Sequence, residues 1–293
     1  MARKADWPWW QQYTGSDEYR IRELLRAILD LNAYYGETTR WMWRGQANSK
    51  FVLNPAIHTR ISLSGQSPDD ALVKSAAERL LAVARQAGLD SHEGTKLPDM
   101  ALLAMLQHYG AATPLLDVSL YPLVGLYMAV VSKDGEQDGE DGVLFAIKRP
   151  DDLAAQPFDT RPFSDVYDGL RSDRAYFYAA PDVSERLKIQ RGHFLLAVVS
   201  NADSRVGLPL TVESGGVAET WLAKRMAQRG ISGKQVPSTT DIAAFRVPKQ
   251  FKAALRTWLE RRTDLTYDYV YPAAWHRPHL ESFCRSHGRS IAV

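Results

Sequence analysis

The local fold of this chain is decided by one stretch, Gln107–Val131, which reads Gln-His-Tyr-Gly-Ala-Ala-Thr-Pro-Leu-Leu-Asp-Val-Ser-Leu-Tyr-Pro-Leu-Val-Gly-Leu-Tyr-Met-Ala-Val-Val. The apolar run 100–106 just before it predicts a helix that ends at Gly110, because glycine readily adopts the left-handed conformation common at helix C-termini. Thr113-Pro114 then predicts an extended path, since the residue before a proline is disfavoured in the helical region.

A short buried strand and a second helix follow in the same stretch. The pair 115–116 predicts the strand, and we expect Asp117 and Ser119 where it ends. Pro122 suits the first turn of an almost wholly apolar helix over 123–131. Polar side chains between two core elements need hydrogen-bonding partners or a function. The first candidate functional residues are therefore Gln107, His108, Asp117 and Ser119.

The composition is that of an ordinary globular protein. Of the 293 residues, 45% are hydrophobic and 24% are charged, which is enough apolar material for a sizeable core. The net charge of +2 is too small to indicate nucleic-acid binding by itself. A single cysteine, Cys284, excludes a disulfide framework and a cysteine-based zinc site, and it suits a reducing compartment.

The sequence also indicates where the protein resides. No apolar run approaches the length of a membrane span, and the first residues lack the apolar segment of a signal peptide. We therefore expect a cytoplasmic protein with no membrane association. The sequence does not indicate an oligomeric state.

The rest of the chain mixes helical and strand patterns, which predicts an α+β fold with one central mixed sheet flanked by helices. Apolar residues at helical spacing predict helices, and alternating or continuous apolar runs predict strands. The expected helices are 16–35, 70–87, 216–229, 249–263 and 279–286, and the main expected strands are 40–46, 142–148, 194–199 and 242–247.

Three segments show no clear periodicity. The segment 90–96 is expected to be a loop, and the polar turn 133–141 is expected to be solvated and mobile. The segment 151–181 is long, aromatic and rich in proline and aspartate, which is typical of a lid over a binding cleft. Its candidates for a stacking wall are Tyr167, Tyr176, Phe177 and Tyr178.

The strand 40–46 carries an arginine next to a glycine. Arg44 is expected to point inward beside Met42, or to lie at the strand end beside Gly45, where backbone can approach a ligand. A buried arginine needs an anionic or multiply hydrogen-bonding partner. That partner is either a bound anion or Asp117 in a structural salt bridge.

Several catalytic motifs are absent from the sequence. It has no phosphate-binding P-loop, no dinucleotide-binding glycine motif, no zinc-protease motif and no nucleophile elbow. The histidines show no metal-ligand spacing beside carboxylates, so no metal site is expected. Ser119 as a nucleophile would need a base, and His108 is the nearest one in the sequence.

Three ordered blocks resemble the FRG domain, a bacterial family named for an aromatic-Arg-Gly signature. The first is Trp43-Arg44-Gly45-Gln46. The second joins Gln107-His108-Tyr109-Gly110 to Thr113-Pro114-Leu115-Leu116-Asp117 and the run 121–129. The third is Arg186-Leu187-Lys188-Ile189-Gln190-Arg191-Gly192-His193-Phe194. The resemblance implies an FRG-like core over 36–200. The residue patterns on either side of it predict an N-terminal aromatic segment and helix over 1–35 and a C-terminal α/β extension over 201–293 packed on the same core.

The same blocks bear a weaker resemblance to the ADP-ribosyltransferase superfamily, which implies NAD as the bound dinucleotide. Aromatic-Arg-Gly resembles the first motif of the arginine-type enzymes, and the third block stands where their catalytic glutamate falls in chain order. Apart from Glu185 that block holds no glutamate, so Gln190 or Asp117 would have to serve as the catalytic residue. The residues expected to contact NAD are Arg44, Gly45, Gln46, Gln107, His108, Tyr109, Ser119 and Tyr127.

Three functions remain open on this basis. The first is an NAD-dependent toxin or anti-phage defence effector that modifies nucleic acid or protein, with an antitoxin or another defence-operon protein as partner. The second is a nucleotide- or RNA-binding sensor without turnover. The third is a buried polar network that fixes the fold. Under the first two we expect one cleft to gather Arg44, Gln107, Asp117 and Gln190.

Overall fold

The computed structural model of the protein describes residues 9–10, 15–34, 41–154, 159–199, 206–210, 241–272 and 277–290. By its contacts the chain divides into two compact units. Unit 1 comprises Met1–Phe51, Ser119–Arg149 and Leu210–Val270, and unit 2 comprises Val52–Val118, Pro150–Pro209 and Tyr271–Val293. Both units draw residues from the predicted core 36–200 and from the predicted extension 201–293, whose boundaries stay a prediction.

Unit 1 is built on a mixed sheet. Its strands lie in the order β1 (Trp9–Trp10), β9 (Ile242–Val247), β6 (Gly142–Lys148) and β2 (Trp41–Gln46). The β1–β9 pair is parallel, while β6 runs antiparallel to both β9 and β2. All but the last residue of β6 are buried, as expected for an apolar strand at the centre of a sheet. The strands predicted over 40–46, 142–148 and 242–247 are confirmed.

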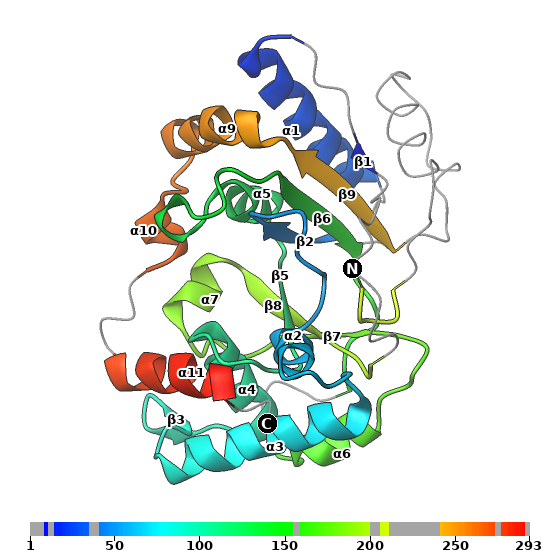
Figure 1. The fold of residues 1–293 in the computed structure, drawn as a ribbon, viewed down its shortest axis with the longest axis vertical. Coiled ribbons are helices and arrows are strands. Elements are labelled where there is room, and N and C mark those ends of the chain that lie inside the picture. Colours follow the sequence, from blue (N-terminus) through cyan, green and yellow to red (C-terminus); the bar gives the residue numbers. More distant parts are fainter. Residues whose placement is uncertain are drawn as a thin grey trace. The chain divides into compact units, whose positions relative to one another are not determined.

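Three helices accompany this sheet in unit 1 (Figure 1). Helix α5 (Pro122–Val130) packs on β2 and β6, and α9 (Lys249–Arg262) packs on α5 and on α1 (Asp17–Tyr34). Pro122 begins α5 as predicted, because its fixed backbone angle suits the first helical turn. At the start of α1 the hydroxyl of Ser16 accepts a hydrogen bond from the backbone N–H of Tyr19 at 3.4 Å. Short helices at Lys133–Gly135 (η1) and Tyr267–Val270 (α10) complete the described part of the unit.

The polar turn 133–141 is exposed over much of its length, as predicted, and hydrogen bonds connect it to the rest of unit 1, while its mobility stays a prediction. The buried ammonium of Lys252 donates hydrogen bonds to the carbonyls of Ala47 at 2.6 Å and Gln137 at 2.7 Å. Asp141 accepts from the guanidinium of Arg246 and, at 2.8 Å, from the backbone N–H of Lys249. Because burial disfavours the charged amine, the pKa of Lys252 is lowered.

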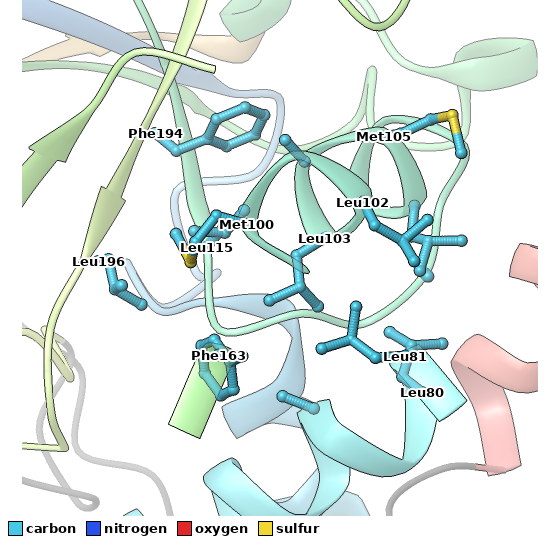
Figure 2. Close-up of a cluster of buried hydrophobic side chains, with 14 of the residues drawn as sticks. Leu80, Leu81, Met100, Leu102, Leu103, Met105, Leu115, Phe163, Phe194 and Leu196 are labelled. Atoms are coloured by element: carbon cyan, nitrogen blue, oxygen red, sulfur yellow. The ribbon is translucent and has the colours of Figure 1, made fainter. Parts of the chain in front are cut away.

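Unit 2 combines three strands with several helices. Strand β8 (Gly192–Leu196) pairs antiparallel with β7 (Tyr176–Tyr178) and has β5 (Leu116–Ser119) on its other side. Buried side chains from α3, α4, α6 and β8 meet in one hydrophobic cluster (Figure 2), which includes Leu80, Leu103, Phe163 and Phe194. The helices of the unit are α2 (Ala56–Leu63), α3 (Asp70–Gln86), α4 (Asp99–His108), α6 (Phe163–Asp168), α7 (Glu185–Ile189) and α11 (Pro278–Ser290).

Two predictions for unit 2 need correction. The expected loop 90–96 is a small hairpin, β3 (Ser91–His92) and β4 (Thr95–Lys96), whose turn residues Glu93 and Gly94 have φ values of 50° and 79°. The segment 151–181 is not wholly irregular, because it contains α6 and β7.

Of the four aromatic candidates for a stacking wall in segment 151–181, three have their rings buried within unit 2, and the role of Tyr176 stays a prediction. Tyr167, Phe177 and Tyr178 are buried, so their rings are not available to a ligand, while Tyr176 is half-buried. The hydroxyl of Tyr167 donates to the Asp70 carboxylate at 2.8 Å, which fixes α6 on the start of α3.

The prediction of an α+β fold is confirmed by this mixture of helices and mixed-sheet strands. The predicted helix 279–286 is the middle of the longer helix α11. Of the N-terminal aromatic segment only Trp9 and Trp10 are described, and the helix predicted over 216–229 lies outside the described residues. None of the described helices is long and apolar enough to cross a membrane.

Candidate functional site

A hydrogen-bonded group in unit 2 links the end of α4 to β5. The side-chain amide of Gln107 donates to the Asp117 carboxylate at 3.4 Å, and its oxygen accepts from the Thr113 hydroxyl at 2.7 Å. The Thr113 oxygen in turn accepts from the backbone N–H of Leu115 at 3.2 Å. These bonds fix which end of the Gln107 amide faces the carboxylate, so Asp117 is held by an oriented donor.

The chain reaches this arrangement through the turn that the sequence predicts. Helix α4 ends at His108, and Gly110 follows with φ of 100°, in the left-handed region that glycine adopts without strain. Asp117 and Ser119 lie within β5 and not beyond it, which corrects their predicted place at the end of the strand. The strand is longer than predicted because its last residue, Ser119, still pairs with Trp43 of β2.

His108 and Arg186 form a second group in unit 2. The guanidinium of Arg186 donates from Nη1 to the backbone carbonyl of His108 at 3.3 Å. Its central carbon lies 4.9 Å from the ring centre of Tyr271, in a cation–π contact. Both contacts orient Arg186 without neutralising its charge.

The environment of the His108 imidazole keeps it neutral. Burial lowers its pKa to about 3, and the charge of Arg186 acts in the same direction, while Asp117 and a backbone hydrogen bond with Arg186 oppose the shift. Its Nε2 is buried and has no hydrogen-bond partner within the described part of the chain. A histidine with so low a pKa is a weak proton acceptor at physiological pH.

Gln190 lies in the turn that joins α7 to β8. Its backbone N–H donates to the Arg186 carbonyl at 2.9 Å, and its side chain is only 5% exposed. The next residue, Arg191, has φ of 45°, and a Cβ on Gly192 would lie 2.6 Å from Leu187 Cδ1, so the Leu187 side chain would have to shift to accept one. The catalytic role of Gln190 stays a prediction.

Tyr109, the next residue after α4, lies on the side of the α4 end that faces α11. It packs half-buried against the hydrophobic cluster of unit 2. Burial raises the pKa of the Tyr109 phenol, and the charges that influence it include Arg277 and Glu281, at and near the start of α11. Its surroundings therefore differ from those of Gln107 and His108.

The first family block lies in β2 of unit 1. Arg44 is half-buried and stands opposite Phe145, while Gln46 is buried opposite Val143. Gly45 packs against α5, because an added Cβ would lie 1.9 Å from the carbonyl oxygen of Gly125. The close backbone approach that the sequence predicts at Gly45 is therefore made by a helix of the protein itself.

Two further candidates in unit 1 have structural partners. The Ser119 hydroxyl accepts from the backbone N–H of Tyr121 at 2.9 Å, which shapes the corner between β5 and α5. Tyr127 is fully buried, and its hydroxyl donates to the Glu260 carboxylate at 3.1 Å. The Ser119 hydroxyl is therefore bound to the backbone of its own turn, and the one histidine near it in the sequence, His108, is weakly basic. Ser119 does not have the surroundings of an activated nucleophile.

The structure thus brings Gln107 and Asp117 into one network in unit 2, with His108 close enough for Asp117 to influence its pKa. Sequence reasoning missed Thr113, Arg186 and Tyr271 as members of these groups. The signal for Arg186 was its position one helical turn before Gln190, within the third block. Arg44 belongs to unit 1, and its predicted convergence with the unit 2 residues stays a prediction.

No cluster of three or more histidine, cysteine or acidic side chains suited to a metal ion occurs among the residues that the structure describes. Cys284 is buried in unit 2, and burial raises the pKa of its thiol to about 12. It is therefore protonated and unreactive at physiological pH.

Comparison with known proteins identifies part of the chain. Residues 39–138 match the FRG domain family, which confirms the first two blocks of the resemblance. This range holds all the predicted site residues except Gln190, and the third block lies beyond it. No curated protein matches the chain significantly, and no solved structure does. The comparisons give no match to an ADP-ribosyltransferase.

Proposed function

We propose that this FRG-domain protein transfers ADP-ribose from NAD to a nucleic-acid or protein acceptor. The observation that supports the proposal is the half-buried carboxylate of Asp117, held by the Gln107 amide at 3.4 Å. Departure of nicotinamide leaves positive charge on the ribose, and a fixed negative group next to that charge stabilises the transition state. Asp117 is the residue of the unit 2 network suited to this role.

The proposed step breaks the bond between ribose C1′ and the nicotinamide nitrogen, which keeps the electron pair. An oxygen or nitrogen of the acceptor then bonds to C1′ and releases a proton. His108 is a poor acceptor for that proton because burial lowers the pKa of its imidazole to about 3. Asp117 would therefore both orient the ribose and receive the proton.

A second predicted residue takes a supporting role in this proposal. Gln190 would orient the reacting ribose from the turn before β8. Such an activity suits a toxin or an anti-phage defence effector whose partner protein holds it in check.

The test uses the purified full chain with NAD labelled in the adenosine part, total RNA or a cell lysate as acceptor, and nicotinamide release as the measured rate. Asp117→Asn removes the charge and keeps the shape, so we expect release to fall by about 10²–10³-fold, the range for losing one preorganised electrostatic contact. The matched control is Asp182→Asn, which changes an exposed aspartate of the same unit.

Either of two results would reject the transfer. One is the absence of nicotinamide release by the wild-type protein at millimolar NAD. The other is an Asp117→Asn variant that releases nicotinamide as fast as the wild type does. Melting temperatures of both variants separate loss of chemistry from loss of folding.

A second function is favoured by Gln190, since a buried amide occupies the block in which the resemblance places a catalytic glutamate. On that basis the protein would be a nucleotide- or RNA-binding sensor without turnover. Calorimetric titration combined with the nicotinamide-release assay distinguishes the two, because a sensor would bind ADP-ribose or RNA and release no nicotinamide from NAD.

A further inference from the structure

We propose that Arg186 is the phosphate-binding residue of unit 2, and that the ligand there is a nucleoside phosphate whose ribose hydroxyls face Asp117. This inference deepens the proposed function, and it rests on it only in taking NAD as one such ligand. It adds a residue that the sequence did not single out and a chemical class for the ligand.

The first observation is the uncompensated charge of Arg186. No carboxylate of the described residues pairs with it, and its Nε is buried without an acceptor among them. Several other arginines of the same unit have carboxylate partners, namely Arg85, Arg161, Arg171 and Arg174, while Arg277 donates to the Ser91 carbonyl and the Met105 sulfur. A half-buried guanidinium without a counter-ion is costly, and a bound anion would remove that cost.

The second observation is that Arg186 is already oriented. The Tyr271 ring covers its face, with 4.9 Å between ring centre and guanidinium carbon, and the His108 carbonyl holds one edge nitrogen at 3.3 Å. A guanidinium held in this way loses little conformational entropy when it binds the planar edge of a phosphate. The residue is therefore built to bind, in addition to joining α7 to the end of α4.

The third observation is an unfilled hydrogen-bonding position beside it. His108 Nε2 is buried and has no partner among the described residues, and burial of such an atom carries a cost until a partner is supplied. Because the imidazole is neutral, it contributes a hydrogen bond without adding charge.

The mixture of charges selects a nucleotide over a bare phosphate. The Asp117 carboxylate influences His108 electrostatically, as Arg186 does, so an anionic group and a cationic group act on the same imidazole. A free phosphate would be attracted by Arg186 and repelled by Asp117. A nucleoside phosphate carries anionic oxygens for Arg186 and hydroxyl donors for Asp117, so it satisfies both.

The experiment is calorimetric titration of the full chain with ADP-ribose, inorganic pyrophosphate and adenosine, none of which requires turnover. The variants are Arg186→Gln and its matched control Lys188→Gln, which removes the same charge from an exposed position of the same helix. We expect Arg186→Gln to weaken ADP-ribose binding about 10- to 100-fold, as for the loss of hydrogen bonds to a charged group. Adenosine affinity should stay the same, and Lys188→Gln should bind like the wild type.

A structural role for Arg186 predicts a different pattern. It would lower the melting temperature and weaken all ligands alike, adenosine included. Arg186→Lys keeps the charge and loses the planar fork, so it serves as a second variant if Arg186→Gln does not fold, and it should bind ADP-ribose with intermediate affinity.

Three results would overturn the inference. They are wild-type affinity for ADP-ribose in Arg186→Gln, pyrophosphate bound by the wild type as tightly as ADP-ribose, and no binding of any of the three compounds at millimolar concentration. Arg186-dependent binding of ADP-ribose without nicotinamide release from NAD would support the inference and reject the transfer, so the two proposals fail separately.

Discussion

The family-motif residues of the two units have different surroundings. In unit 1 the motif residues contact other parts of the same unit. Gly45 packs against the backbone of α5, the Ser119 hydroxyl accepts from a backbone N–H, and the Tyr127 hydroxyl donates to a carboxylate. In unit 2, the end of α4 and Arg186 leave a cation without a carboxylate and an imidazole nitrogen without a partner among the described residues. The comparison shows that the sequence blocks contain both residues that pack elements together and residues that present unfilled polar positions.

The difference has a simple physical origin. A strand glycine is required wherever another backbone approaches closely, whether that backbone is a ligand or a helix. In unit 1 the approaching group is α5, which leaves no room for a Cβ on Gly45 or on Gly142 of the neighbouring strand. In unit 2 the polar residues Gln107 and His108 are the last two residues of α4, and Arg186 lies in the short helix α7.

The largest effect is expected when the packing role of unit 1 is broken with Gly45→Ala. The new Cβ would lie 1.9 Å from the Gly125 oxygen and 2.6 Å from the Ala129 nitrogen, and both are backbone atoms of α5 that cannot move aside cheaply. We expect the free energy of unfolding to fall by at least about 3 kcal/mol, at the upper end of the range for overpacking. Urea unfolding followed by circular dichroism measures the change.

The matched control is Gly139→Ala in the polar turn of the same unit, where an added Cβ meets nothing within 4 Å. Stability there should change by less than about 0.5 kcal/mol, as for most surface substitutions. If Gly45→Ala proved as stable as this control but lost nucleotide affinity, Gly45 would belong to a ligand site and the contrast between the units would be wrong.

A second effect concerns the pH dependence of stability in unit 2, to which every histidine that the structure describes belongs. His58 on α2 is 2% exposed, and burial lowers its pKa from 6.5 to about 4, with Asp70 opposing the shift. Between pH 6.5 and 4 the unfolded chain binds a proton at this residue that the folded protein does not. Stability is therefore lost as the pH falls through this range, by roughly 3 kcal/mol for this residue.

The variant His58→Leu removes this contribution. Urea unfolding at several pH values between 7 and 4 should show the wild type losing stability relative to the variant as the pH falls. The exposed His279 of α11, replaced in the same way, is the control for removing a histidine from unit 2. Parallel stability curves for the wild type and His58→Leu would show that burial of this imidazole has no linkage to folding.

Most of the longer helices of both units could be predicted from the sequence, and so could strands β2, β6 and β9 of unit 1, because their signals are local. Helix α3 shows apolar spacing along one face, and β6 is a continuous apolar run bounded by a glycine. The hairpin after α3 was missed because its strands have two residues each and its turn is Glu93-Gly94, not the Asn-Gly or Asp-Gly pair that marks such turns.

The site could be predicted only where its residues are close in sequence. Gln107 at the end of α4, Thr113 in the turn that follows and Asp117 in β5 lie in the short stretch 107–117, and Gln107 and Asp117 are among the candidates predicted from the sequence. Arg186 donates to the His108 carbonyl 78 residues earlier in the sequence, and Lys252 donates to the Gln137 carbonyl 115 residues earlier. No local sequence pattern predicts contacts between residues so far apart in the chain. Whether a motif residue packs or binds depends on such partners, which is why Gly45 could not be interpreted from the sequence alone.

The smallest expected effect distinguishes packing from binding at Ser119, the one candidate placed at the corner between β5 and α5. Ser119→Ala removes the acceptor for the Tyr121 N–H at 2.9 Å and leaves that group without its side-chain partner. We expect a loss of about 1 kcal/mol in the free energy of unfolding, the usual contribution of one hydrogen bond, with little change in affinity for ADP-ribose. Thermal unfolding and calorimetric titration measure the two quantities on the same samples.

Ser49→Ala in the same unit is the control, because the hydroxyl of Ser49 makes no hydrogen bond with the described residues. A tenfold weaker affinity with unchanged stability would instead assign Ser119 to the ligand site, and unit 1 would then share the binding role that the comparison gives to unit 2.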